Sequence, residues 1–431
     1  MIKKLSKNLN GKNGLRGEIT IPADKSISHR AVMFSALAKG VSTIENFSKG
    51  GDCLSSLAVL NTLGIKSEFK DEKTLIIKAT NGFQIPTGAT QELFCGNSGT
   101  TMRLMSGVLA GQNFDSILTG DESLSKRPMA RVIKPLELMG AKIISNENKA
   151  PLKILGQNLN GIDYVSELAS AQVKSCVLLA GLNANGKTSF TEPHVSRNHT
   201  ELMLEYLGAK IHVQGNKTTI EQSKLTSKTI NVAGDISSAS FFIVAGLIVP
   251  NSDIILKNVG LNPTRTGILD IVKKMGGDIE ILDKKIVSNE EVGDLRIKYS
   301  ELKACTIEGA IIPRLIDELP VIAVLATQAD GITVIKDAQD LRNKESDRIK
   351  AIVTELKKIG AKIEETEDGF TIEGKTPLHG DAIVETYHDH RLAMSLYVAG
   401  LICQNPISIN EFEWVNISFP EFEELMIKLY S

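Results

Sequence analysis

One short phrase recurs at the ends of amphipathic stretches along the chain. A large apolar residue is followed by glycine, at Leu63–Lys66, Met139–Lys142, Leu207–Lys210, Met275–Asp278 and Ile359–Lys362. The preceding residues have helical apolar spacing and the following ones alternate as in a strand. Glycine suits such a helix end because it takes the left-handed conformation without a Cβ clash. The copies, about 70 to 85 residues apart, predict a repeated α/β subdomain, and a last helix near 420–430 would belong to a sixth copy.

Composition and charge limit the class of protein. The 431 residues, enough for two or three domains, carry 49 Lys and Arg against 51 Asp and Glu, a net charge of −2. This balance argues against nucleic-acid binding, which needs a basic surface. The longest apolar run, 241–250, has roughly half the length of a bilayer-spanning helix, and Met1–Lys7 does not resemble a secretory signal. Five cysteines without CxxC spacing predict reduced thiols in the cytoplasm and no zinc site.

Polar segments that lead into apolar helices carry the candidate chemistry. Asp24–Arg30 combines capping residues with two cations, and Cys95–Arg103 is a glycine-rich turn that lets a ligand approach backbone N–H groups. Each segment alone is equally consistent with a solvated helix start. Together they predict a pocket for one or two small polyanions, with carboxylates that move protons. The cations are Lys25, Arg30, Arg127, Arg197, Lys344, Arg348 and Arg391, and the carboxylates are Asp317 and Glu345.

Two other motifs are interpreted as coincidental. Residues 181–188 match the phosphate-binding pattern GxxxxGK[ST], but an apolar helix precedes them where a true P-loop has a buried strand. We therefore expect a helix-to-strand turn there. His388 and His390 flank Asp389 as a metal site might, but no further group has ligand spacing, and we expect no metal.

Six motifs follow one another along the chain: Asp24–Arg30, Gly96–Arg103, Lys126–Pro128, Ser170–Lys174, Lys344–Arg348 and Asp389–Arg391. This ordered set resembles the 3-phosphoshikimate 1-carboxyvinyltransferase, or 5-enolpyruvylshikimate-3-phosphate synthase, family over essentially the whole chain. The resemblance implies a reaction in which phosphoenolpyruvate and shikimate 3-phosphate give 5-enolpyruvylshikimate 3-phosphate and phosphate, in chorismate synthesis and without a cofactor.

The resemblance also implies the architecture. It predicts an α/β (α+β) fold of two similar domains, each built from three β-α-β-α-β-β repeats, as in the inside-out α/β barrel of enolpyruvyl transferases. One domain would combine 1–22 with 238–431, the other would span 23–237, and the active site would lie in the cleft between them. We expect a monomer whose partners are its two small-molecule substrates.

Residue roles follow from matching motif positions. The resemblance implies that Asp317 takes the proton of the attacking 5-hydroxyl, while Glu345 and Lys25 handle protons at the methylene carbon and the leaving phosphate. Shikimate 3-phosphate would contact Lys25, Ser26, Arg30, Ser170, Ala171, Gln172, Arg197, Asp317 and Lys344. Phosphoenolpyruvate would contact Lys25, Gly99, Arg127, Gln172, Arg348 and Arg391.

Some positions depart from part of the family. Ile417 stands where that part has a lysine, and Asp340 replaces an asparagine. Ser170–Lys174, Arg197–Glu201 and Asn262–Arg265 instead resemble a second, often glyphosate-tolerant subgroup, although Ala23 replaces its usual glycine. We expect reduced glyphosate sensitivity. Gly99 is an argument against it, because tolerant members often have alanine there and glycine leaves room for the inhibitor.

Two alternatives stay open. The UDP-N-acetylglucosamine enolpyruvyl transferase family shares the fold and uses phosphoenolpyruvate, but it has a reactive cysteine before its Arg-Pro that 121–126 lacks. The other alternative is a non-catalytic repeat scaffold whose cations lie on unrelated surfaces.

Overall fold

The computed structural model describes residues 2–5 and 14–430. Met1, Ser6 and Lys7, which belong to the stretch considered as a secretory signal, lie outside the described residues. No helix within the described ranges is long and apolar enough to cross a membrane.

Two compact units make up the chain. Unit 1 consists of Met1–Pro22, Gly234–Ile286 and Glu291–Ser431, and unit 2 consists of Ala23–Ala233 and Val287–Glu290. The chain therefore passes from unit 2 back to unit 1 between residues 233 and 234, a few residues before the expected boundary between 237 and 238. A hairpin tip, 287–290, also joins unit 2, which the sequence did not indicate.

One sheet topology repeats in both units. In five four-stranded sheets of the described residues the first two strands are parallel and the third is antiparallel to the second. Unit 2 contains β16(Thr229–Asn231)-β4(Val41–Glu45)-β6(Leu75–Lys78)-β5(Lys66–Phe69), β7(Thr90–Phe94)-β8(Asp115–Thr119)-β10(Lys149–Leu155)-β9(Lys142–Asn146) and β11(Asp163–Val165)-β12(Lys187–Thr191)-β14(Lys217–Glu221)-β13(Ile211–Gln214), besides the short pair β3(Ala38–Lys39)-β15(Leu225–Thr226).

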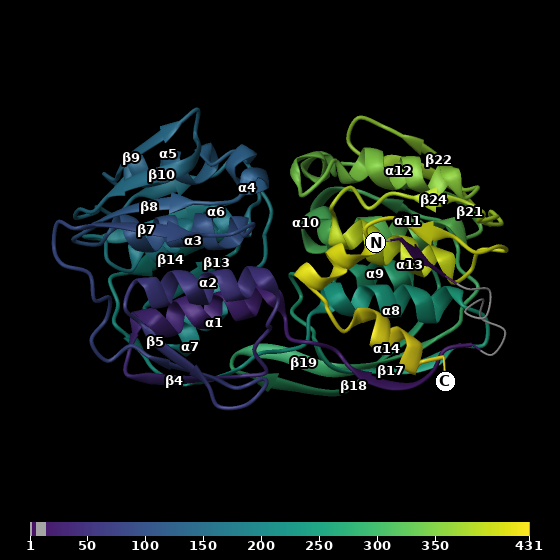
Figure 1. The fold of residues 1–431 in the computed structure, drawn as a ribbon, viewed down its shortest axis with the longest axis horizontal. Helices are drawn as coiled ribbons and strands as arrows, with labels where there is room; N and C mark the ends of the chain where they lie inside the picture. Colours follow the sequence, from purple (N-terminus) through teal and green to yellow (C-terminus); the bar gives the residue numbers. More distant parts are fainter. Residues whose placement is uncertain (1, 6–13, 431) are drawn as a thin grey trace. The chain divides into compact units, whose positions relative to one another are not determined.

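Unit 1 repeats this plan with one reduced sheet (Figure 1). Its strands are β2(Arg16–Thr20)-β17(Asp253–Gly260)-β19(Glu290–Lys298)-β18(Asp278–Val287), β20(Thr306–Ile307)-β21(Gly331–Ile335)-β23(Phe370–Gly374)-β22(Lys362–Glu365) and the three-stranded β1(Lys3–Lys4)-β25(Ser408–Ile409)-β24(Ile383–Val384).

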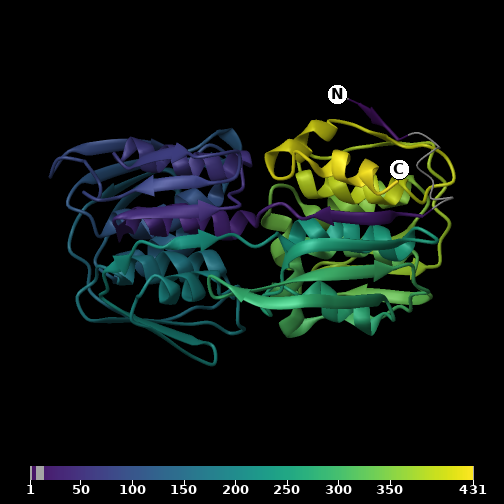
Figure 2. The same cartoon turned by 90° about the horizontal axis from the view of Figure 1, so that it is seen from below.

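Three helices that are buried nearly all round form the centre of each unit, counted over the described residues. In unit 2, α3 packs against both α1 and α6; in unit 1, α11 packs against α8 and α13 (Figures 1 and 2). α8 and α11 are almost entirely apolar, as expected of helices surrounded by protein, whereas α1 and α6 also bury charged side chains, Arg30 and Lys174. The six helices are α1(Lys25–Leu37), α3(Gly99–Ala110), α6(Ala171–Gly181), α8(Ile236–Ile248), α11(Leu319–Thr327) and α13(His390–Gly400).

A second set of helices is half-exposed and ends in the recurring glycine. The five glycines of the phrase, Gly64, Gly140, Gly208, Gly276 and Gly360, have φ of 85°, 98°, 94°, 86° and 103°. Each lies between a helix and a strand, so the predicted helix–glycine–strand repeat is confirmed. The five helices are α2(Gly51–Thr62), α5(Ala130–Leu138), α7(His199–Tyr206), α9(Gly267–Lys274) and α12(Arg348–Lys358). A sixth helix, α14(Phe422–Lys428), is followed by neither the glycine nor a strand in the described residues.

Short helical segments complete the two units. They are α4(Glu122–Lys126), α10(Ile312–Leu315) and the 3-10 turns η2(Gly309–Ile311), η3(Ile316–Glu318), η4(Gln339–Asn343) and η5(Phe412–Ile417). The P-loop-like residues 181–188 join the end of α6 to the start of β12. The expected helix-to-strand turn is therefore confirmed.

Candidate functional site

The buried helices of each unit begin close together. In unit 2, Gln172 Nε2 at the start of α6 donates to Thr100 Oγ1 at the start of α3, 3.0 Å away. In unit 1, Ser237 at the start of α8 donates to Glu318, which directly precedes α11. Helix N-termini carry unpaired N–H groups and a partial positive charge, so each group of starts favours a bound anion.

Lys25 opens α1 and has a carboxylate partner. Its Nζ lies 2.6 Å from Asp52 Oδ2 on α2. Asp24 caps α1 by accepting from Ile27 N at 2.8 Å, which fixes the first turn. The ammonium of Lys25 is therefore held in one place at the helix start, although the sequence analysis did not single out Asp52.

Arg30 lies inside unit 2 and is only 3 % exposed. Its Nε donates to Thr200 Oγ1 at 2.7 Å and its Nη2 to Ser175 Oγ at 2.9 Å. Its Nη1 donates to the carbonyl oxygen of Ser26 at 2.9 Å. These bonds join α1 to α6 and α7, so Arg30 organises this end of the unit as well as being a predicted ligand contact.

Gly99 lies beside two guanidinium groups. A Cβ atom added to Gly99 would stand 2.9 Å from Arg103 Nη1 and 3.5 Å from Arg127 Nη1. Arg103 Nη1 also donates to Gln172 Oε1 at 2.7 Å. Arg127 Nη2 donates to Asn97 Oδ1 at 2.8 Å. Of the predicted phosphoenolpyruvate contacts, the structure thus brings Gly99, Arg127 and Gln172 together, and Arg103 joins them.

The remaining predicted residues of unit 2 lie at or just before the starts of α1, α6 and α7. Ser170 caps α6 by accepting from Val173 N at 3.5 Å, and Ala171 is the first residue of that helix. Arg197 is half-buried in the loop that leads from β12 to α7. Ser26 is in the first turn of α1.

Asp317 gathers three predicted cations of unit 1. Its Oδ1 lies 3.3 Å from Arg348 Nη1 and 3.5 Å from Lys344 Nζ. Arg391 Nη1 donates to the Asp317 carbonyl oxygen at 3.1 Å. All of the predicted site residues of unit 1 therefore lie in one ion-pair network, because Glu345 also reaches Arg348.

Arg348 is the buried centre of that network, with a side chain 1 % exposed. Its Nη2 lies 2.6 Å from Glu345 Oε2 and its Nε 2.7 Å from Asp389 Oδ2. Burial opposes the charge of Arg348, but the surrounding carboxylates, Asp389 first, outweigh it and raise its pKa. Burial likewise opposes ionisation of Asp389, yet the guanidinium of Arg348 keeps the pKa of that carboxyl below its ordinary value.

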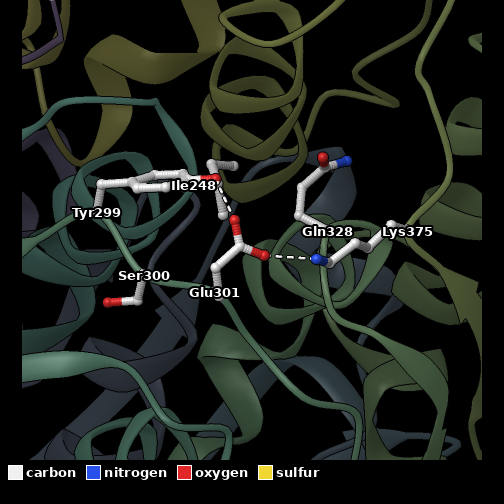
Figure 3. Close-up of a pocket in the computed structure, with 6 residues that line it drawn as sticks. All are labelled: Ile248, Tyr299, Ser300, Glu301, Gln328 and Lys375. Carbon is white, nitrogen blue, oxygen red and sulfur yellow. Dashed lines mark hydrogen bonds and ion pairs between the residues drawn. The ribbon is translucent and has the colours of Figure 1, made fainter.

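Two hollows in the described part of unit 1 are lined by none of the predicted residues. One of about 110 Å³ is lined by Tyr299, Glu301 and Lys375, among others, and Glu301 there accepts from both Tyr299 and Lys375 (Figure 3). No group of three or more His, Cys, Asp or Glu side chains in the part of the chain that the structure describes is arranged to hold a metal ion.

Sequence comparisons identify relatives over nearly the whole length. The sequence model of the family described as EPSP synthase (3-phosphoshikimate 1-carboxyvinyltransferase) matches residues 9–426. A 3-phosphoshikimate 1-carboxyvinyltransferase of Thermoanaerobacter sp. strain X514 is 52 % identical over 413 residues, which are 95 % of this chain and 97 % of the relative. One from Bacillus licheniformis is 51 % identical over 420 residues, 97 % of this chain and 98 % of the relative.

Solved structures give the same result for the fold. EPSP synthase from Acinetobacter baumannii superposes with a TM-score of 0.88 at 43 % identity, over 99 % of this chain and 98 % of that one. The enolpyruvyl transferase NikO from Streptomyces tendae has a TM-score of 0.79 at 16 % identity, over 97 % and 96 % of the two chains, and so shares the fold. The repeated sheets, the clustered helix starts and these full-length matches show that the chain belongs to the EPSP synthase (3-phosphoshikimate 1-carboxyvinyltransferase) family.

Proposed function

We propose that this chain transfers the carboxyvinyl group of phosphoenolpyruvate to the 5-hydroxyl of shikimate 3-phosphate and releases phosphate. Membership of the 3-phosphoshikimate 1-carboxyvinyltransferase family supports this reaction of the shikimate pathway. The observation that carries the proposal for this chain is the network in which Lys344, Arg348 and Arg391 surround Asp317. Such a network offers cations for phosphate and carboxylate groups next to a carboxylate that accepts a proton.

The proposed ligand contacts belong to both units. Phosphoenolpyruvate is assigned to Lys25, Gly99, Arg127 and Gln172 of unit 2 and to the two arginines of the unit 1 network. Shikimate 3-phosphate is assigned to Asp317 and Lys344 of unit 1, and in unit 2 to Lys25, Ser26, Arg30, Ser170, Ala171, Gln172 and Arg197. In this proposal, the two domains bind one pair of ligands in the cleft between them.

The proposed chemistry is addition followed by elimination. Asp317 takes the proton of the 5-hydroxyl while the hydroxyl oxygen of shikimate 3-phosphate bonds to C2 of phosphoenolpyruvate. A proton from Glu345 or Lys25 adds to C3. The resulting tetrahedral ketal phosphate then loses a proton from the new methyl group while its C–O bond to phosphate breaks. Fixed cations stabilise the charge that develops on the phosphate and carboxylate oxygens.

A turnover assay with Asp317→Asn tests this function. The wild-type protein should release phosphate only when both substrates are present. Asp317→Asn should lower kcat by about 10²- to 10⁴-fold, the usual contribution of a general base. Asp253→Asn, which alters a half-exposed ion pair with Arg296 in the same unit, should keep full activity.

Two results would contradict the proposal. Phosphate release with UDP-N-acetylglucosamine in place of shikimate 3-phosphate would favour the related transferase. Full activity of Asp317→Asn would reject Asp317 as the base. The proposal also includes a monomer in the cytoplasm, to be checked by light scattering on the purified protein and by cell fractionation.

A further inference from the structure

The residues just before Asp389 form a tight turn with unusual backbone angles. Asp389 N donates to the carbonyl oxygen of Thr386 at 2.9 Å. The two central residues, Tyr387 and His388, have φ of 53° and 58°. Positive φ at both central positions is the pattern of a type I′ turn, which favours Asn and Gly. Bulky side chains are strained there, and such strain persists only where surrounding contacts hold it.

Tyr387 is held by a buried carboxylate. Its hydroxyl donates to Glu355 Oε1 at 2.7 Å, and the Glu355 side chain is fully buried in α12. The other oxygen, Oε2, accepts from the backbone N–H of Glu385 at 2.9 Å, so one carboxylate holds two points of the loop. Burial and Glu355 raise the pKa of Tyr387 to about 12, which keeps the hydroxyl a donor at any ordinary assay pH.

His388 is held by residues in and just before η5. Its ring stacks on Trp414 with centroids 4.8 Å apart, and its Nε2 lies 2.9 Å from a carboxylate oxygen of Glu411. Both strained residues therefore have side-chain contacts that Asn and Gly, the residues such a turn prefers, would not make.

The last residue of the turn, Asp389, belongs to the ion-pair network of Arg348. Its carboxylate caps α13 by accepting from Arg391 N at 2.9 Å, and it also accepts from Arg348 Nε at 2.7 Å. Since Asp389 is fully buried, a shift of the turn moves this carboxylate and with it both arginines.

We propose that Glu355 and Tyr387 are positioning residues, which hold the strained 386–389 turn so that Arg348 and Arg391 are oriented for phosphoenolpyruvate. This inference rests on the proposed function, because it concerns how one substrate of that reaction is bound. Neither Glu355 nor Tyr387 needs to touch the ligand.

The test is Tyr387→Phe, which removes one hydroxyl from a partly exposed side chain. We expect KM for phosphoenolpyruvate to rise about threefold to tenfold, the loss typical of one hydrogen bond. The KM for shikimate 3-phosphate and kcat should stay within about twofold. Trp414, the single tryptophan of the chain, should report the loosened turn through a changed fluorescence in Tyr387→Phe.

Tyr299→Phe is the matched control, since Tyr299 also donates to a glutamate, Glu301 at 3.0 Å, in the hollow of Figure 3. It should change none of these values. An unchanged KM for phosphoenolpyruvate in Tyr387→Phe, or a general loss that affects kcat and both KM values, would overturn the inference. Absence of turnover by the wild-type protein would instead overturn the proposed function.

Discussion

Asp389 and Arg348 are a buried pair whose charges depend on each other. Asp389→Asn keeps a side chain that can cap α13 but removes the fully buried anion that lies 2.7 Å from the Arg348 guanidinium. Breaking a buried pair typically costs about 3 to 5 kcal/mol. Glu345 and Asp317 remain beside Arg348 in this variant, so the loss should lie at the lower end of that range. We therefore expect the free energy of unfolding at neutral pH to fall by about 3 kcal/mol, as measured by urea denaturation.

Asp253→Asn provides the comparison at the same scale. Asp253 also has two bonds to one arginine, Arg296, but those side chains are 26 % and 40 % exposed. A solvated pair contributes about 0 to 1 kcal/mol, so this variant should lose little. Equal losses in the two variants would contradict the assignment of Asp389 as a buried anchor.

The same pair predicts a pH dependence. Arg348 lowers the pKa of Asp389 in the folded protein, so the carboxyl binds its proton less readily when folded than when unfolded. The stabilisation is complete above the unfolded pKa, about 3.9, and is lost as the pH falls through the lower folded value. The stability difference between wild type and Asp389→Asn should therefore be constant from about pH 5 to 8 and shrink below about pH 4. A difference that persists unchanged in acid would contradict this mechanism.

At the scale of single elements, the repeated glycine has a measurable cost of replacement. Gly140 ends α5 with φ of 98°, and a Cβ there would meet nothing within 4 Å. Gly140→Ala therefore introduces only backbone strain, about 1 to 2 kcal/mol. Gly111 caps α3 with φ of −95°, and a Cβ there would meet ordinary contacts at 3.5 Å. Gly111→Ala should be neutral or stabilise slightly. Urea denaturation of both variants checks the difference, and equal effects would contradict it.

The elements differ in how far the sequence predicts them. The helix–glycine–strand repeat was predictable because its signals, apolar spacing and a glycine at the helix end, are local. Partners distant in the chain were not predictable. Asp52 meets Lys25 and Asp389 meets Arg348 only after helices pack. Burial was equally hidden, since Arg348 was expected in a charged helix start and lies inside the unit.

At the scale of the whole molecule, the proposed site requires both units to act on one pair of ligands. The residues assigned to phosphoenolpyruvate are divided between unit 2, which contains Arg127, and unit 1, which contains Arg391. A ligand that binds residues of both units favours conformations in which they approach it together. In a non-catalytic scaffold no ligand has this effect.

Small-angle scattering separates these two cases. With shikimate 3-phosphate and phosphoenolpyruvate at saturation, the radius of gyration of the wild-type protein should fall relative to the ligand-free protein. Lys344→Ala removes a partly exposed cation, 3.5 Å from Asp317. This variant should need a higher shikimate 3-phosphate concentration to reach the same radius of gyration, because Lys344 is one of the unit 1 contacts assigned to that ligand. Lys375→Ala alters a surface pair with Glu301 in the same unit and should respond as the wild type does. A radius of gyration that stays constant at saturation, in a protein that turns over, would mean that the ligands act without drawing the units together.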